Sequence, residues 1–182
     1  MKTDLSTYTT GDYSPGRGKL VVACWYLVNT LFFKNSLSVF SGLKRFLLRL
    51  FGASVGEGVI IKPKVNIKYP WRLEVGDHSW IGEGVWIDNL AEVKIGKHVC
   101  LSQGAMLLTG NHNYKKETFN LITEPIKLED GVWIGAQSVV CPGVQCKSHC
   151  ILSVGSVANK DMEEYSIYQG NPAEFKRKRN PQ

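Results

Sequence analysis

Aliphatic residues recur at every sixth position over most of the chain, beginning at Val55. Blocks of six open with VGEGVI at Val55, VGDHSW at Val75, IGKHVC at Ile95 and LEDGVW at Leu128, and the first three openings are 20 residues apart. Neither the 3.6-residue period of a helix nor the two-residue period of a single strand explains this spacing. A triangular coil does, because three sixes close one turn and each inward aliphatic side chain stacks on its copy in the next turn. The pattern predicts an all-β solenoid of parallel strands over residues 53–160.

The segment before the repeat has a different pattern. The apolar run Leu20–Phe33 has 14 residues, which is shorter than the roughly 20 that a membrane-spanning helix needs. We expect a packed helix there, a break at Lys34–Ser36, and a second helix over Ser36–Phe51 that ends at Gly52. These helices would form an N-terminal extension, after a polar leader, within residues 1–52. They are expected to cover the open end of the coil, and their basic and apolar side chains also suit peripheral contact with a membrane surface.

The repeat is interrupted after Leu107, where the chain reads LLTGNHNYKKETFNL, and it resumes near Ile126. This leaves an excursion loop at about residues 111–126. Long excursions from a compact scaffold are usually functional or disordered, and the aromatic residues in this one disfavour disorder. The remaining residues, 161–182, form a basic C-terminal tail, for which a solvated segment is one interpretation.

The charge and the cysteine content limit which ligands and which cellular compartment are expected for the protein. The net charge is +6 and the pI about 9.1, which suits a phosphate-bearing ligand, an anionic membrane surface or nucleic acid. Nucleic acid is disfavoured because the basic residues are not interleaved with aromatics on a recognised module. Five cysteines without a CxxC pair favour buried thiols in a reducing cytosol, and the N-terminus lacks the apolar core of a secretory signal. We therefore expect a cytoplasmic protein, with the inner face of the membrane as an alternative location.

The repeated sixes resemble the hexapeptide-repeat acyltransferases, whose fold is a left-handed parallel β-helix. The hand of the helix is implied by this resemblance and not by the spacing. Three further stretches, LKRFLLRLFGASVGEGV, WIDNLAEVKIG and TGNHNYKKETFNLITEPIKLEDGVWIGA, resemble acetyltransferases of the colanic-acid type from exopolysaccharide synthesis. The first coil departs from the pattern, because IKPKVN and IKYPWR lack the glycine.

The resemblance implies a catalytic role for His112, which lies at the base of the excursion. In this family a histidine at that place is the general base, and an imidazole of ordinary pKa can accept a hydroxyl proton at neutral pH. A histidine that only caps the loop is the alternative.

The other histidines do not form a similar group. His78, His98 and His149 share the fourth place of their sixes, which predicts outward-facing corner positions. Stacked imidazoles can bind a metal, and the gamma-class carbonic anhydrases bind zinc on a related β-helix. Their closely spaced ligand pair is missing after His112, so no metal is expected.

The family's acyl donor is acetyl-CoA, which becomes the expected co-substrate. The positions of this chain that match the family's coenzyme contacts are Trp133, Ala136, Val154, Gly155, Asn159, Lys160 and Arg177. Asn159 stands where threonine is frequent, and Glu174 stands where a basic residue can occur, so these contacts are the weaker part of the match. Trp133 could equally be an ordinary strand aromatic.

For the acceptor, Asn89 is the position that matches an acceptor-binding asparagine in related sugar acetyltransferases. Its neighbour Asp88 and the loop residue Tyr114 complete the expected substrate-binding set. Asn and Asp are also common at such corners simply because they tolerate tight turns.

Together these features predict an acetyl-CoA-dependent O-acetyltransferase that acts on a sugar or exopolysaccharide precursor. The family is usually homotrimeric, with active sites at subunit interfaces. Two alternatives remain open: a non-catalytic β-helix scaffold in a polysaccharide assembly complex, and a zinc-dependent lyase.

Overall fold

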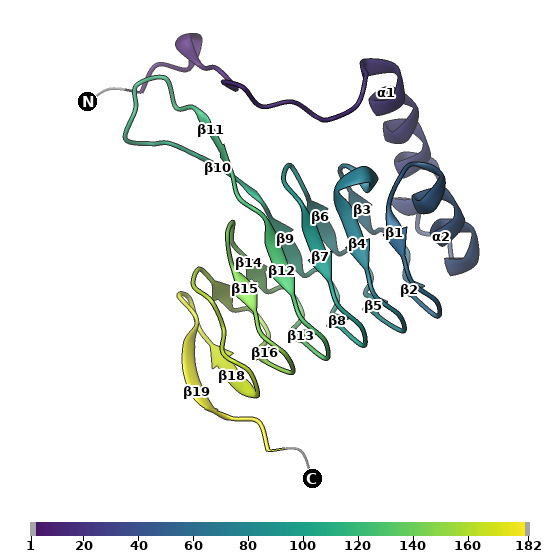
Figure 1. The fold of residues 1–182 in the computed structure, drawn as a ribbon, viewed down its shortest axis with the longest axis vertical. Helices are drawn as coiled ribbons and strands as arrows, with labels where there is room; N and C mark the ends of the chain where they lie inside the picture. The colour runs from purple at the N-terminus through teal and green to yellow at the C-terminus, as the bar shows by residue number, and fades with distance from the viewer. Residues whose placement is uncertain (1–2, 181–182) are drawn as a thin grey trace.

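The computed structural model describes residues 3–180 and consists of a parallel β-solenoid of about six turns behind a short helical region. Figure 1 shows the stacked turns, with α1 and α2 at one end and the C-terminal strands at the other. The three sides of the solenoid are three sheets, which we call sheets A, B and C and which are parallel except for the last strand of sheet B.

Sheet A contains five strands: β1 (Ser54–Val55), β4 (Leu73–Val75), β7 (Val93–Ile95), β12 (Ile126–Leu128) and β15 (Gln145–Cys146). Sheet B contains β2 (Ile60–Ile61), β5 (Trp80–Ile81), β8 (Cys100–Leu101), β13 (Trp133–Ile134), β16 (Ile151–Leu152), β18 (Ser166–Gln169) and β19 (Glu174–Lys178). Sheet C contains β3 (Asn66–Ile67), β6 (Trp86–Asp88), β9 (Met106–Leu108), β14 (Val139–Val140) and β17 (Val157–Ala158).

The aliphatic position of each six points inward, as the repeat predicted. Val55, Val75, Ile95, Leu128 and Cys146 are register partners along sheet A, and all of them are buried. Equivalent buried ladders run along sheets B and C. Each turn therefore buries its apolar edge against the next one, which is why a stack of turns is stable where a single turn would not be.

The corners between strands require left-handed backbone, and glycine occupies many of them. Lys64 has φ 59° at the corner of the first turn, where the next two turns carry Gly84 and Gly104. This is the departure that the sequence pattern marked in IKPKVN. The Lys64 ammonium is paired with Glu83 of the second turn at 2.9 Å.

The helical region covers the open end of the first turn. It comprises α1 (Lys19–Val28), the π-helical turn η2 (Asn29–Phe33) and α2 (Ser41–Leu50). The second helix is shorter than expected, because residues 36–40 stay outside it. Trp25, Phe33 and Leu48 are buried against the solenoid.

Cationic side chains of α2 satisfy carbonyl groups that no preceding turn can reach. Lys44 Nζ donates to Lys62 O at 2.8 Å, Arg45 to Val59 O at 2.9 Å, and Arg49 Nε to Val55 O at 2.9 Å. Buried carbonyls need such partners, so these residues replace the missing turn. Desolvation lowers the pKa of Lys44 to about 8.

The C-terminal residues form regular structure that the interpretation as a tail did not anticipate, although Glu174–Lys178 stay exposed to solvent, as that interpretation expected. Strand β18 continues sheet B, and β19 folds back on it as an antiparallel strand. Lys178 Nζ donates to Ser166 Oγ at 3.1 Å, and Arg179 donates to His149 O at 3.1 Å. The basic run is therefore part of the solenoid through Arg179.

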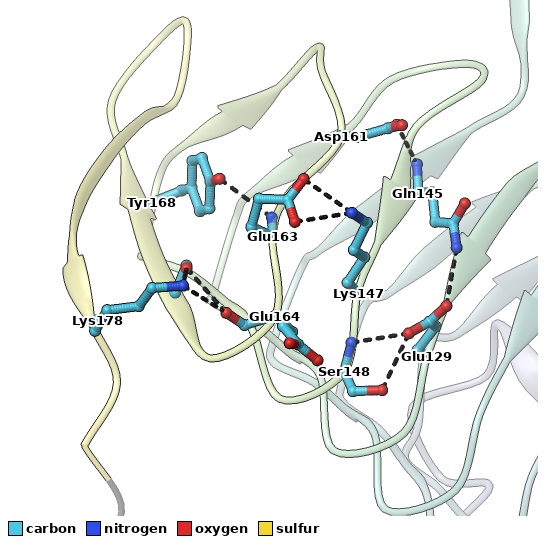
Figure 2. A network of polar contacts seen from close by, with 10 residues as sticks. Glu129, Gln145, Lys147, Ser148, Asp161, Glu163, Glu164, Tyr168 and Lys178 are labelled. Atoms are coloured by element: carbon cyan, nitrogen blue, oxygen red, sulfur yellow. Dashed lines mark hydrogen bonds and ion pairs between the residues drawn. The ribbon is translucent and has the colours of Figure 1, made fainter.

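A polar network ties the last turns together (Figure 2). The Glu129 carboxylate accepts hydrogen bonds from Gln145 Nε2 at 2.9 Å and from Ser148 N and Oγ at 3.0 Å each. Lys147 forms an ion pair with Glu163 at 2.8 Å. The hydrogen bond from Lys127, followed by those from Ser148 and Gln145, lowers the pKa of Glu129 to about 2.

Candidate active site

The excursion is a β-hairpin that leaves the corner between sheets C and A. Strands β10 (Gly110–His112) and β11 (Leu121–Thr123) pair antiparallel, with His112 opposite Leu121. The sequence predicted a loop here, and it did not reveal the two strands. Figure 1 shows the hairpin projecting away from the stacked turns.

The hairpin fixes the orientation of the His112 ring. His112 Nδ1 lies 3.0 Å from the carbonyl oxygen of Phe119. A carbonyl can only accept, so Nδ1 carries a proton, and in the neutral imidazole Nε2 is then the nitrogen with the lone pair. The Phe119 ring stacks on the imidazole with a centroid distance of 4.5 Å and an interplanar angle of 5°. This geometry leaves His112 able to accept a proton at Nε2.

Phe119 adopts an uncommon backbone conformation to reach this arrangement. Its φ is 47°, a left-handed value that is a genuine outlier for a bulky residue. Strained residues of this kind cluster at functional sites. Nothing in the sequence pattern singled out Phe119 as a partner of His112.

The N-terminal leader also reaches the hairpin. Asp4 N donates to Glu117 O at 3.0 Å, and the Tyr8 ring lies 5.7 Å from the His112 ring. Farther along, the Trp71 indole donates to Pro15 O at 2.7 Å. The leader therefore forms one wall beside His112, a role for which the sequence carried no repeat or motif signal.

A groove of about 570 Å³ runs along the outer face of sheet B. It brings together four of the seven expected coenzyme-binding residues: Trp133, Ala136, Val154 and Arg177. Its floor includes the outward side chains of Ile151 and Ile167, which sequence reasoning had not named. A mainly apolar groove whose lining includes an arginine guanidinium suits a ligand that joins an apolar arm to phosphate groups.

Trp133 is held on the groove wall by a hydrogen bond. Its indole Nε1 donates to Ser102 Oγ at 2.9 Å, and 47% of the residue is exposed. Since a half-exposed tryptophan offers a large flat surface, it is suited to contact with a ligand.

The other three expected coenzyme residues lie outside this groove. Gly155 is at a left-handed corner with φ 66°, and its N–H donates to Ala136 O at 2.9 Å. Asn159 and Lys160 are exposed at the corner after β17. The structure therefore separates the expected set into a groove and a neighbouring corner.

The expected acceptor residues are also dispersed. Asn89 is fully buried, and its amide pairs with the backbone of Tyr69: Oδ1 accepts from Tyr69 N at 2.9 Å, and Nδ2 donates to Tyr69 O at 2.6 Å. This geometry supports a corner-stabilising role and does not support a direct contact with acceptor. Tyr114 is exposed in the hairpin loop, and Asp88 is half-buried beside Lys68, whose Nζ lies 2.9 Å from Asp88 Oδ1.

The remaining histidines occupy left-handed corners, as their shared place in the repeat suggested. The rings of His78 and His98 stack 5.5 Å apart, and His149 stacks on Tyr165 at 4.9 Å. Within residues 3–180, no group of three or more histidine, cysteine or acidic side chains could hold a metal ion. All five cysteines are free thiols.

His112 and the groove lie on opposite sides of one protomer. The hairpin leaves between β9 of sheet C and β12 of sheet A, whereas Trp133 belongs to sheet B. In a triangular coil, the corner between two sides faces away from the third side. Figure 1 agrees, with the hairpin and β13 at opposite edges of the solenoid.

No family model matches the chain, but several known proteins are similar to it. The chain is 34% identical over 176 residues to the colanic acid biosynthesis acetyltransferase WcaF of Escherichia coli K12, and the match covers 97% of each chain. It is 26% identical over 137 residues to galactoside O-acetyltransferase of the same organism, covering 74% of this chain and 68% of that one. Among solved structures, a hexapeptide-repeat acetyltransferase of Vibrio cholerae complexed with acetyl-CoA has a TM-score of 0.83 at 21% identity over 97% of each chain.

The fold is a hexapeptide-repeat β-helix with a groove along one sheet, and the structural likeness confirms the left-handed parallel β-helix. Given the similarity to WcaF over nearly the whole of both chains, this chain belongs to the hexapeptide-repeat acetyltransferase family. It is an acyltransferase that uses acetyl-CoA as its co-substrate.

Proposed function

We propose that this protein transfers the acetyl group of acetyl-CoA to a hydroxyl group of a sugar or exopolysaccharide precursor, with His112 as the general base. The observation that carries the proposal is the hydrogen bond between His112 Nδ1 and the Phe119 carbonyl, since it reserves Nε2 for the acceptor hydroxyl. The names of WcaF and galactoside O-acetyltransferase support a carbohydrate acceptor.

The reaction follows from these roles. The acceptor oxygen attacks the thioester carbonyl while its proton moves to Nε2 of His112. The tetrahedral intermediate then collapses, the carbon–sulfur bond breaks, and the coenzyme leaves as the thiol after taking the proton back. Trp133, Ala136 and Val154 would hold the slender arm of the coenzyme, and Arg177 would pair with a phosphate.

We propose further that the active site is shared between subunits of a homotrimer. The support is that the hairpin and the groove lie on opposite sides of the protomer. One copy cannot bring His112 to its own groove, whereas a closed ring of copies can bring the hairpin of one to the groove of the next. Asn159 and Lys160 would then lie beside the coenzyme at the same interface.

We also propose that the helical region makes peripheral contact with a membrane surface. Residues 13–56 contain six basic residues and no acidic one. Within residues 3–180, no helix is long and apolar enough to cross a bilayer, but the region exposes many large apolar side chains: Leu20, Val21, Tyr26, Leu27, Leu31, Leu37, Val39, Phe40, Leu43, Phe46 and Leu50. Such a surface suits an anionic bilayer. Sedimentation with anionic vesicles, and its loss in a Phe40→Ser, Phe46→Ser double variant, would support this contact, and failure of the wild type to sediment would contradict it.

Thiol release from acetyl-CoA, measured across a panel of sugars, tests the reaction itself. Removal of the base is expected to lower turnover by about 10²–10⁴-fold in His112→Ala, with coenzyme binding retained. His98→Ala is the matched control, because it removes an imidazole that stacks on His78 and does not line the groove. Unchanged turnover in His112→Ala would contradict the assigned base. A wild type that neither turns over nor binds the coenzyme would favour the scaffold alternative.

A further inference from the structure

A second concave site lies between the helical region and the outer face of sheet C. Its volume is about 230 Å³, and its walls come from α1, η2, β3 and β6. It is smaller than the roughly 300–1,000 Å³ pockets that hold drug-sized ligands, so a single ring is the natural size of occupant. None of the residues that line the coenzyme groove takes part in it.

Aromatic side chains form the apolar part of this pocket. Trp86 and Tyr26 line it with 38% and 69% of their surfaces exposed. Trp25 lies behind them, buried, with its indole donating to Ile67 O at 2.9 Å. Exposed aromatic faces beside a rigid wall are suited to the apolar C–H face of a sugar ring.

Hydrogen-bonding groups face the same space. Asp88 Oδ1 is buried and forms an ion pair with Lys68 Nζ at 2.9 Å. An ionised carboxylate can accept about four hydrogen bonds, so Asp88 retains capacity to accept one from a ligand hydroxyl. Asn66 Oδ1 accepts from Asn29 Nδ2 at 2.8 Å, so the donor end of the Asn66 amide is the part left for a ligand.

The side chains that line the pocket include one positive charge that no acidic side chain of the pocket balances. Lys68 is paired with Asp88, whereas Lys34 forms no ion pair with any residue in the described part of the chain. The surrounding residues 13–56 contain no acidic side chain. A ligand with one negative charge would complement this surplus.

The pocket is connected to the strand that leads to His112. Asp88 is the register partner of Leu108, and Thr109 Oγ1 donates to Asp88 O at 2.9 Å. The hairpin with His112 begins directly after Thr109. Asp88 and the residue that precedes the hairpin therefore lie side by side on neighbouring turns of the same protomer.

We propose that this pocket binds a pyranose that carries a carboxylate or phosphate group, as the acidic part of the acceptor. Trp86 and Tyr26 contact the ring, Asp88 and Asn66 bind its hydroxyls, and Lys34 pairs with the anionic group. The assignment rests on the proposed sugar acetyltransferase function and adds the class of acceptor to it.

Calorimetric titration of the full-length protein with glucuronate, glucose 1-phosphate and glucose tests the pocket independently of turnover. The wild type is expected to bind one of the two acidic sugars at least tenfold more tightly than glucose, and the preferred one identifies the anionic group. Lys34→Gln should remove that preference without changing glucose binding, and Lys34→Arg should restore it. Lys94→Gln on sheet A is the charge-matched control and should leave every affinity unchanged.

The outcomes separate the pocket from the reaction. Equal affinities for acidic and neutral sugars, or an unchanged preference in Lys34→Gln, would overturn the pocket assignment even if acetyl transfer proceeds. A wild type that binds the acidic sugar but never releases thiol from acetyl-CoA would instead contradict the proposed function. Thermal unfolding and coenzyme binding of each variant verify that the fold is retained.

Discussion

The outer faces of sheets A and B are built from the same position of the repeat, yet they have opposite chemistry. In sheet A the outward residues are Ser54, Glu74, Lys94, Lys127 and Gln145. In sheet B they are Ile60, Trp80, Cys100, Trp133, Ile151 and Ile167. The inward ladder needs no such difference, because both sheets bury aliphatic side chains equally well. We infer from this contrast that sheet A faces water and that sheet B faces a ligand or another subunit.

The largest expected effect is a recovery of activity when two inactive variants are mixed, and it tests this contrast between the two faces. His112→Ala removes the base, and Ala136→Trp fills the groove on sheet B, so each variant alone should be inactive. If each site combines a hairpin and a groove from different subunits, random reassembly of an equal mixture should restore about one quarter of the sites. The measurement is thiol release after the two variants are unfolded and refolded together.

The same mixture can contradict a shared site. His112→Ala that is unfolded and refolded alone gives the background activity. If the mixed sample stays at that background while chromatography shows mixed trimers, His112 and the groove act within one subunit. A protein that is active as a proven monomer would lead to the same conclusion.

Truncation of Trp133 probes the groove on sheet B more gently. Trp133→Ala should weaken acetyl-CoA binding by about tenfold, which corresponds to roughly 1.4 kcal/mol, because a half-exposed aromatic wall is lost. Trp133→Phe should retain most of the affinity, since the hydrogen bond to Ser102 contributes less than the ring. Equal coenzyme affinity in Trp133→Ala and wild type would place the coenzyme elsewhere.

The repeat explains why the solenoid was predictable from the sequence. Each inward position, such as Ile81 or Leu101, is defined by its spacing alone, and its neighbours in space are its copies in sequence. The groove residues Trp133, Ala136 and Val154 could be anticipated for the same reason, since a family pattern fixes their places in consecutive turns.

Contacts outside the repeat could not be predicted in this way. The Tyr8 ring beside His112 and the Lys44 ammonium over Lys62 O join residues that share no period. Strand β19 was interpreted as a tail because its composition, EFKRK, is that of a charged segment. Asn89 matched an acceptor-binding position, but its amide is bonded to the Tyr69 backbone. Each of these depends on three-dimensional neighbours that spacing does not encode.

The pH dependence of stability should differ between Glu129, whose carboxylate belongs to a hydrogen-bond network beside sheet A, and an isolated carboxylate. The folded-state pKa of Glu129 is about 2, below its ordinary value of 4.5. The carboxylate therefore stabilises the fold fully above about pH 4.5, and this contribution is lost as the pH falls through about 2. We expect Glu129→Gln to lower the free energy of unfolding by about 1 kcal/mol at pH 7, a small amount because solvent screens a partly exposed carboxylate. The variant should also lose less stability than the wild type on acidification, because it lacks the carboxylate that becomes protonated.

Denaturant unfolding of wild type and Glu129→Gln at pH 7, 4 and 3 measures this effect. Glu74→Gln is the control, since among residues 3–180 Glu74 forms an ion pair only with the exposed Lys94, at 3.5 Å. Parallel acid dependence in wild type and Glu129→Gln would contradict the role of the network.

The smallest expected effect on the comparison of the two faces is that of a substitution at Lys94. Lys94 lies in the middle of sheet A, paired at 3.5 Å with Glu74 and at 3.7 Å with Glu92, and 48% of its side chain is exposed. Because exposed ion pairs contribute little, Lys94→Gln should change the free energy of unfolding by less than about 0.5 kcal/mol and leave acetyl transfer unchanged. Trp80 occupies the outward position of sheet B one turn earlier, and Trp80→Gln should instead alter assembly or turnover. Chromatography and thiol release measured on both variants compare one geometric position on two faces, so a large effect at Lys94 or none at Trp80 would contradict the division between a solvent face and a contact face.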